Sequence, residues 1–183
     1  MKKILIILLI LAIIPTVIFA KGFSFGIGAT ASTGSTISNI VENKTVDVSN
    51  FNYGAYANVK LFLVSVNATA FPKFDGGYLY FIGDLSANLA VDFSILRVQA
   101  GLSMGYFGGA TEFKDVELHF YADDIKEVPL SVRAEIDLIF SGLNIGIWGL
   151  LPTEATFTSF DKIVEVKDKW KNASVGISLG VCF

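Results

Sequence analysis

Ser174-Val-Gly-Ile-Ser-Leu-Gly-Val-Cys-Phe183 alternates large apolar residues with small residues over its whole length. Successive side chains of a strand point to opposite faces, so one face is entirely apolar and consists of Val175, Ile177, Leu179, Val181 and Phe183. The opposite face carries serine, glycine and cysteine, where a half-buried strand in water would carry charged residues. This pattern predicts a strand with lipid on its apolar side and a crowded interior on its small side.

The aromatic residue that ends this strand adds a family resemblance. A terminal strand of this kind resembles the C-terminal assembly signal of bacterial outer-membrane β-barrels, which the barrel-assembly machinery reads. Ser178 and Val181 stand where that family usually has glycine and a second aromatic residue. The resemblance implies the assembly machinery as a partner during biogenesis and outer-membrane lipid as the surroundings.

The N-terminal residues have the composition of a secretory signal. Lys2 and Lys3 precede an apolar run from Ile4 to Ile14, and Ala20 precedes polar, glycine-rich sequence. These features predict a cleaved signal peptide over residues 1–20 and a barrel domain over residues 21–183. A retained N-terminal membrane anchor is the alternative, because the run to Ala20 is close to the minimum length for spanning a bilayer.

Charge and cysteine content restrict the partners. Removal of residues 1–20 would leave 12 of the 14 basic residues against 17 acidic ones, so the net charge would change from -3 to -5. We therefore expect no nucleic-acid partner. The single cysteine, Cys182, cannot form an intramolecular disulfide, and no cysteine follows the signal region where a lipoprotein would be acylated.

The composition indicates membrane residence without membrane helices. Hydrophobic residues make up 52% of the chain and the mean hydropathy is +0.58, yet no apolar stretch after residue 20 approaches the ~18 residues that a membrane helix needs. A closed β-barrel is the other structure that satisfies its backbone hydrogen bonds in lipid.

Period-2 alternation predicts eight strands, and helical spacing is nowhere sustained. The predicted strands are residues 22–32, 51–61, 64–71, a segment ending near 93, 96–107, 128–140, 143–151 and 174–183. Tight turns are expected near Phe62, near Ile95 and at Ser141-Gly142, and longer loops at residues 34–50, 72–77, 108–127 and 152–171. Short turns at one rim and long loops at the other are typical of bacterial outer-membrane barrels, with the turns and both chain ends on the periplasmic side.

Aromatic residues near the strand ends predict two girdles at the membrane interfaces. The girdle expected on the loop side consists of Tyr53, Phe71, Tyr78, Tyr80 and Tyr106, and the girdle on the turn side of Phe23, Phe93, Phe140 and Phe183. With these features, the chain resembles the small eight-stranded outer-membrane barrels of the OmpA transmembrane, OmpX and OmpW kind. The predicted fold class is an all-β, antiparallel, up-and-down transmembrane barrel.

The inward faces of these strands collect charged residues of both signs. They are Lys60, Asp84, Asp92, Arg97, Arg133, Glu135 and Asp137. Eight strands enclose only enough room for side chains, and an isolated buried charge is costly. We therefore hypothesise a salt-bridged plug of Arg97 and Arg133 with Asp92, Glu135 and Asp137, and a water-filled pore lined by the same residues is the competing interpretation.

No catalytic, cofactor or metal site is predicted. The single histidine, His119, falls in a loop with Glu117 and Asp123, and Ser103 is the nearest serine on a strand, but no motif joins them. The loop carboxylates lack calcium-loop spacing. Gly146-Ile147-Trp148 is similar to the Gly-x-Trp motif of lipocalins, but lipocalins carry it on the first strand and have apolar interiors.

The sequence favours a non-enzymatic barrel with a structural or surface-interacting role, whose outer loops would contact a host or envelope partner. A narrow channel for small or apolar solutes, as in the OmpW kind, is the first alternative. A lipid-modifying outer-membrane enzyme is the second.

Overall fold

The computed structural model describes residues 22–33, 51–75, 78–110, 117–120, 124–164 and 172–183. The predicted signal peptide and the predicted loop at residues 34–50 lie outside these ranges. Within them, no helix is long and apolar enough to cross a membrane.

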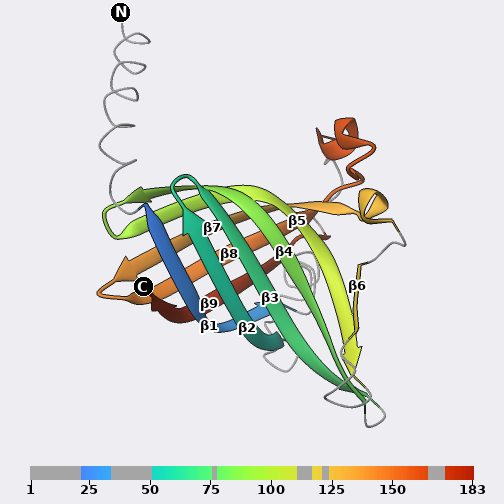
Figure 1. The fold of residues 1–183 in the computed structure, drawn as a ribbon, viewed down its shortest axis with the longest axis horizontal. Helices are drawn as coiled ribbons and strands as arrows, with labels where there is room; N and C mark the ends of the chain where they lie inside the picture. Colours follow the sequence, from blue (N-terminus) through green and yellow to red (C-terminus); the bar gives the residue numbers. More distant parts are fainter. Residues whose placement is uncertain (1–21, 34–50, 76–77, 111–116, 121–123, 165–171) are drawn as a thin grey trace, which may run out of the picture.

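Eight antiparallel strands form a closed barrel (Figure 1). They are β1 (Phe23–Thr33), β2 (Phe51–Leu61), β3 (Val64–Asp75), β4 (Tyr78–Phe93), β5 (Leu96–Ala110), β7 (Leu130–Phe140), β8 (Leu143–Pro152) and β9 (Ser174–Cys182). A short additional strand, β6 (Glu117–Phe120), pairs with the end of β5. The eight-stranded up-and-down topology expected from the alternation is confirmed.

The first and last strands close the barrel. β1 pairs antiparallel with β9 from Gly26 opposite Cys182 to Ser32 opposite Gly176. Phe25 and Phe183 exchange two backbone hydrogen bonds of 3.1 and 2.8 Å, so the terminal strand is paired up to its last residue. Because this pairing leaves no strand edge within the barrel wall, every backbone group there can be satisfied without water.

The predicted tight turns are also present. Two-residue connections join β2 to β3, β4 to β5 and β7 to β8, and Phe62, Ser94 and Ser141 have positive φ at their first position. Ser141 and Gly142 both have positive φ, which is the type I′ geometry that matches the twist of a hairpin. We call this end the turn rim and the opposite end the loop rim; the C-terminus lies at the turn rim (Figure 1).

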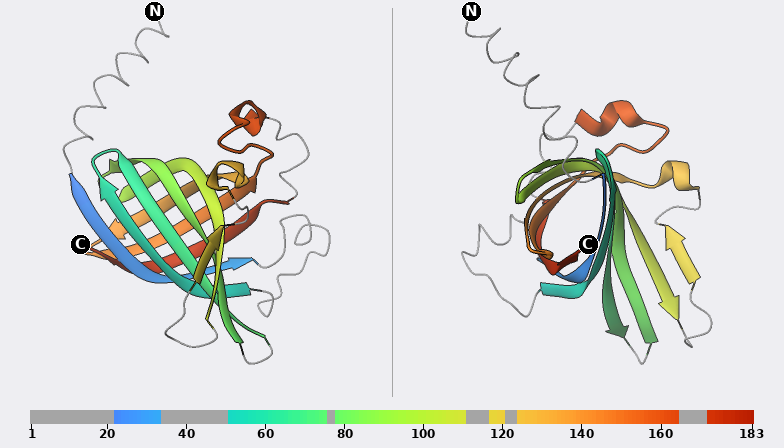
Figure 2. Two further views of the ribbon diagram at one scale, coloured as in Figure 1. Left: turned by 45° about the vertical axis from the view of Figure 1, so that its right-hand side comes forward. Right: turned by 60° about the vertical axis from the view of Figure 1, so that its left-hand side comes forward.

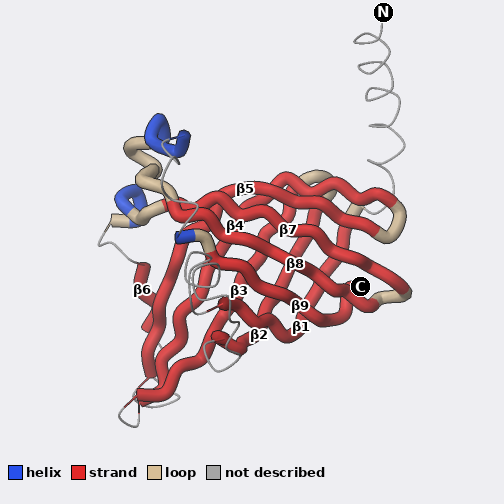
Figure 3. Tube along the Cα trace, turned by 180° about the vertical axis from the view of Figure 1, so that it is seen from behind, coloured by secondary structure: helices blue, strands red, loops and turns tan. Residues whose placement is uncertain are grey.

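Two predicted boundaries were wrong at the loop rim. β3 continues to Asp75 and β5 continues to Ala110, where loops starting at residues 72 and 108 were expected; β4 starts at Tyr78, directly after the expected loop at residues 72–77. β3, β4, β5 and β6 therefore form a sheet that projects beyond the closed wall (Figure 2; from behind in Figure 3). We call this part, residues 71–75, 78–82, 106–110 and 117–120, the sheet extension.

Two short 3-10 helices, η2 (Ile125–Glu127) and η3 (Phe160–Val164), lie in the connections that flank β7 and β8 at the loop rim. Between them, Thr153 and Ala155 fold over the start of β7. Leu130 donates its backbone N–H to the Ala155 carbonyl at 2.8 Å, and its own carbonyl accepts the Thr153 hydroxyl at 2.6 Å. Leu130 is consequently buried although it belongs to the outward face of its strand.

Candidate functional site: the barrel lumen

The inside of the barrel is polar and the outside is apolar, the reverse of a soluble protein. Most of the buried side chains are polar or charged, whereas the apolar residues of each strand are exposed, among them Ile147 (64%), Leu89 (68%) and Ile177 (57%). Such an apolar outer surface around a polar core is that of a membrane-spanning barrel.

All seven charged residues predicted for the lumen are buried there, with at most 8% of any one exposed. They come from β2, β4, β5 and β7, and the alternation of each strand places them on the inner face. They form two ion-paired groups at different depths, and polar uncharged residues connect the groups.

The first group, near the turn rim, contains two cations that share one carboxylate. Lys60 Nζ lies 2.9 Å from Asp92 Oδ2, and Arg97 Nε lies 2.7 Å from Asp92 Oδ1. The two remaining Arg97 nitrogens donate to Asn58 at 3.2 Å and to the Ser24 hydroxyl at 2.9 Å. Arg97 thereby joins β5 to β1, β2 and β4.

In the second group, nearer the loop rim, one cation bridges two carboxylates. Arg133 Nη1 lies 2.7 Å from Asp84 Oδ1, and Arg133 Nη2 lies 2.9 Å from Glu135 Oε2. Asp84 also accepts hydrogen bonds from the Thr69 and Ser103 hydroxyls. Arg133 therefore links β7 to β4, two strands that do not neighbour each other in the sheet.

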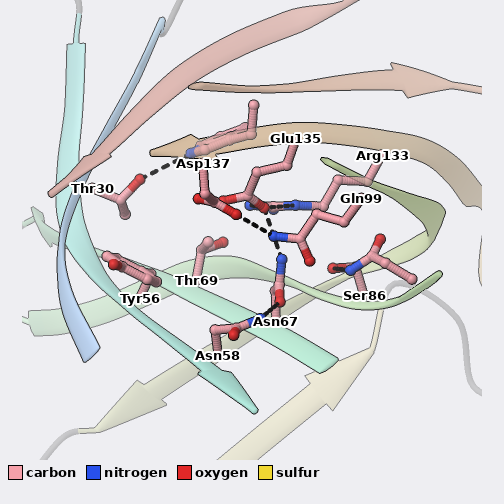
Figure 4. Close-up of polar contacts among 12 residues, drawn as sticks. Thr30, Tyr56, Asn58, Asn67, Thr69, Ser86, Gln99, Arg133, Glu135 and Asp137 are labelled. Atoms are coloured by element: carbon pink, nitrogen blue, oxygen red, sulfur yellow. Dashed lines mark hydrogen bonds and ion pairs between the residues drawn. The ribbon is translucent and has the colours of Figure 1, made fainter. Parts of the chain in front are cut away.

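Uncharged side chains cross the lumen between these groups (Figure 4). Asn67 donates to Glu135 Oε2 at 2.7 Å and accepts a hydrogen bond from Asn58. Gln99 donates to Asp137 Oδ2 at 2.8 Å, and its carbonyl accepts from the Ser65 hydroxyl at 2.5 Å. The hydrogen bonds thus run without interruption from the wall formed by β2 and β3 to the wall formed by β5 and β7.

Two aromatic residues fill the opposite wall, which is rich in glycine. The Trp148 ring covers Gly176, and the Tyr56 ring and hydroxyl cover Gly28 and Gly180, where a Cβ would overlap them. Trp148 donates to the Thr30 hydroxyl at 3.2 Å, and the Arg133 guanidinium lies 4.7 Å from the centre of its ring. These glycines make the space into which the large side chains fit.

The sequence prediction covered part of this network. The plug hypothesis joined Arg97 and Arg133 to Asp92, Glu135 and Asp137, but Arg97 and Asp137 are cross-strand neighbours whose side chains have other hydrogen-bond partners. Asp84 and Lys60 take part instead. The roles of Asn67, Gln99, Tyr56 and Trp148 were missed, although their inward positions follow from the same alternation.

At the loop rim, the lumen opens into a vestibule of mixed polar and apolar lining, with a cavity volume of about 290 Å³. Asp84, Ser103 and Trp148 form its inner end, and Phe71, Asn52 and Ser131 line its sides. Phe71, predicted for the loop-side girdle, belongs to the inward face of β3 and is only 5% exposed, so that assignment was wrong. Phe71 lies near a strand end, which is typical of a girdle residue, but the alternation of β3 puts it on the same inward face as Asn67 and Thr69.

The sheet extension presents aromatic side chains to its surroundings. Phe74 is 80% exposed and Tyr78 is 60% exposed. Tyr106 instead lies over Gly83 and donates its hydroxyl to the Thr69 carbonyl at 2.6 Å, an arrangement in which a ring covers the bare backbone of a glycine. The pairing of β2 with β3 ends at Ala55 opposite Ala70, so β3 continues beyond its neighbour.

The residues considered for catalysis do not come together along the described strands. In the β5–β6 pairing, His119 stands opposite Phe107, four residues from Ser103, which corresponds to ~13 Å along a strand. Hydrogen-bond contact between a base and a nucleophile needs about 3 Å. The side chains of Glu117 and His119 and all of Asp123 lie outside what the structure describes. Among the described residues, no group of three or more His, Cys, Asp or Glu could hold a metal ion.

The chain matches no protein-family model, and no curated protein matches it at a significant level. Among solved structures, it is similar to the crystal structure of Neisserial surface protein A (NspA), with a TM-score of 0.42 and 14% sequence identity over 88% of this chain and 96% of that one.

Proposed function

We propose that this protein is a non-enzymatic β-barrel of the bacterial outer membrane, with a structural or surface-interacting role and a lumen that side chains close to solutes. The observation that carries the proposal is the Arg133 bridge to Asp84 and Glu135, together with the hydrogen bonds that connect it to Asn67, Asn58 and Arg97. These contacts tie non-neighbouring strands together across the interior. Permeation of a solute would require breaking buried ion pairs, which is costly.

Two features support a location in the outer membrane: the apolar outer surface around a polar interior, and the different lengths of the connections at the two rims. Lipid-exposed barrels with two-residue turns on one side and longer connections on the other belong to that membrane. In this arrangement the turn rim faces the periplasm, and the sheet extension stands outside the cell. A predicted cleaved signal over residues 1–20 would deliver the chain there.

A surface role is supported by the sheet extension. It exposes Phe74 and Tyr78, and its β3 edge continues past the last residue that pairs with β2. An extracellular or envelope protein could add an extended segment to such an edge through backbone hydrogen bonds. Pro72 and Lys73 in this edge are residues that oppose uncontrolled pairing, so the partner would have to accommodate them.

A narrow channel is the second candidate, because the vestibule brings a cavity of about 290 Å³ to Asp84. Flux measurements decide between the two. The refolded chain is inserted into phospholipid vesicles, its insertion is checked by protection from protease, and the release of ions and small dyes is followed. We expect no flux above that of empty vesicles; steady flux from inserted protein would make the channel the correct function.

A further inference from the structure

One part of the lumen wall holds buried oxygen atoms without hydrogen-bond donors. Asp137, Gly146 and Ser178 stand side by side on one rung of β7, β8 and β9. Asp137 Oδ1 and Ser178 Oγ have no hydrogen-bond partner, although the residues are only 1% and 3% exposed. A buried acceptor without a donor costs free energy, so this pair requires an explanation.

These oxygens converge on the space above Gly146. At the place where a Cβ of residue 146 would be, Ser178 Oγ is in contact, Asp137 Oδ1 is 2.5 Å away and Glu135 Oε1 is 3.3 Å away. The other glycines of this wall, Gly176 and Gly180, are covered by Trp148 and Tyr56. Only oxygen atoms are found over Gly146 among the three nearest atoms.

A fourth oxygen lies on the adjacent inward position of β8. Asn144 Oδ1 is buried and has no hydrogen-bond partner, while its amide nitrogen donates to the Tyr56 hydroxyl at 3.2 Å. The wall around Gly146 therefore has two carboxylates, one hydroxyl and one amide carbonyl, with Trp148 on one side and Tyr56 on the other. Oxygen donors of these types bind hard cations.

The buried charges of the lumen do not balance. In the described part of the chain, three buried basic residues stand against four buried acidic ones. Arg97 directs all its nitrogens to Asp92, Asn58 and Ser24, and Arg133 directs its contacts to Asp84 and Glu135. Asp137 accepts from the uncharged Gln99, so the unmatched negative charge is at the cluster of oxygens.

We propose that Asp137 Oδ1, Ser178 Oγ, Glu135 Oε1 and Asn144 Oδ1 bind a monovalent metal cation of the sodium class above Gly146. One positive charge balances the excess of one carboxylate. It also gives a partner to Asp137 Oδ1, Ser178 Oγ and Asn144 Oδ1, the three oxygens of this set that have no hydrogen bond. A divalent ion is disfavoured, because Glu135 already shares its charge with Arg133 and calcium needs six to eight oxygens. The site does not depend on whether the lumen conducts.

The test is the dependence of stability on the identity of the cation. The full chain is refolded into a zwitterionic detergent in sodium, potassium, calcium or choline chloride at constant ionic strength, and the urea midpoint of unfolding is measured. At a sodium concentration a hundredfold above Kd, the midpoint should exceed that in choline by about 1 M. An equal midpoint in all salts would overturn the proposal and leave a proton or water at the site.

Substitutions test whether the sodium-dependent stabilisation comes from the oxygens around Gly146. Ser178→Ala removes one ligand with little change in volume, and Asp137→Asn removes the charge; both should abolish the difference between sodium and choline. Asp92→Asn is the matched control, because this buried carboxylate has Lys60 and Arg97 as partners, and it should lower the midpoint in every salt while the sodium effect persists. A sodium effect that survives in Ser178→Ala and Asp137→Asn would overturn the assignment to this site.

Direct binding gives a second readout that does not depend on how much the variants destabilise the barrel. Sodium-23 resonance broadening is measured on the folded wild type and is expected to be lost in Asp137→Asn. A larger, saturating midpoint shift with calcium and none with sodium would overturn the monovalent assignment.

Discussion

Arg133 Nη1 and Asp84 Oδ1 lie 2.7 Å apart inside the barrel, although 49 residues and one intervening strand separate them. Each group is almost completely buried, with side chains 2% and 7% exposed. Removing either partner of such a buried pair is strongly destabilising, because the remaining group is then an uncompensated buried charge.

Arg133→Ala should therefore destabilise the barrel strongly. The substitution leaves Asp84 and Glu135 without their shared cation, and we expect a loss of about 3–5 kcal/mol in the free energy of unfolding. Urea titration of the refolded protein measures the loss, and vesicle flux shows whether the lumen has opened. The exposed Lys126→Ala is the control and should stay within about 0.5 kcal/mol of the wild type. An unchanged midpoint together with no flux would contradict a closing role of Arg133.

Arg97→Lys tests whether the hydrogen-bonding geometry of the guanidinium stabilises the barrel beyond its positive charge. Lysine retains a positive charge beside Asp92 but cannot reach Asn58 and Ser24 with a planar fork, so we expect a loss of about 1–3 kcal/mol. In the Arg97→Lys background, Ser24→Ala should cost less than it does in the wild type, because the contact is already gone. Equal costs of Ser24→Ala in both backgrounds would show that the serine contributes independently of Arg97.

The barrel could be predicted from sequence because strand parity is a strictly local signal. Alternation over ten residues fixes which side chains share a face, and so it placed Lys60, Asp84 and Arg133 correctly inside the barrel. The alternation does not reveal which charged residues form ion pairs, because inward side chains reach across the lumen to strands that are not sheet neighbours. The Arg133–Asp84 pair is of this kind, and Asp137 has Gln99 as its partner although Arg97 stands opposite it.

Strand ends were harder to predict for a physical reason. Residues 72–75 contain Pro72 and Lys73, which are typical of loops, yet they continue β3 because β4 pairs with them as far as Asp75 opposite Tyr78. Pro72 is tolerated because it lies beyond the last pairing of β3 with β2. Long-range pairing therefore decided a boundary that local composition assigned to a loop.

Trp148→Phe should reveal the contribution of the indole to the lumen. It removes the hydrogen bond to Thr30 and weakens the contact with the Arg133 guanidinium, and we expect a loss of about 1–2 kcal/mol. Trp170→Phe gives a single-tryptophan protein, so that the emission of Trp148 can be observed alone; burial predicts a blue-shifted maximum. An emission maximum typical of tryptophan in water would contradict a filled lumen at this position.

Ile147→Lys should show which surface contacts lipid. Ile147 is 64% exposed, lies between Ile136 and Ile177 in the middle of the wall, and would carry a charge into the hydrocarbon region. We expect a loss of about 2–4 kcal/mol in vesicles. Phe74→Lys, on the 80% exposed residue of the sheet extension, is the matched control and should cost much less. Similar costs at both positions would contradict the separation of the wall from the extension.

The orientation of the barrel follows from which rim a protease can reach. Lys126 is exposed in η2 at the loop rim, so trypsin added to intact Gram-negative cells that express the protein should cleave after it. The fragment is identified by mass, and Lys126→Gln should remove that cleavage and no other. The turn rim, marked by an epitope tag inserted at the Ser141-Gly142 turn, should be reached only once the outer membrane is ruptured. Cleavage at Lys126 only after rupture would reverse the orientation and would place the sheet extension in the periplasm, where its partner would have to be an envelope protein.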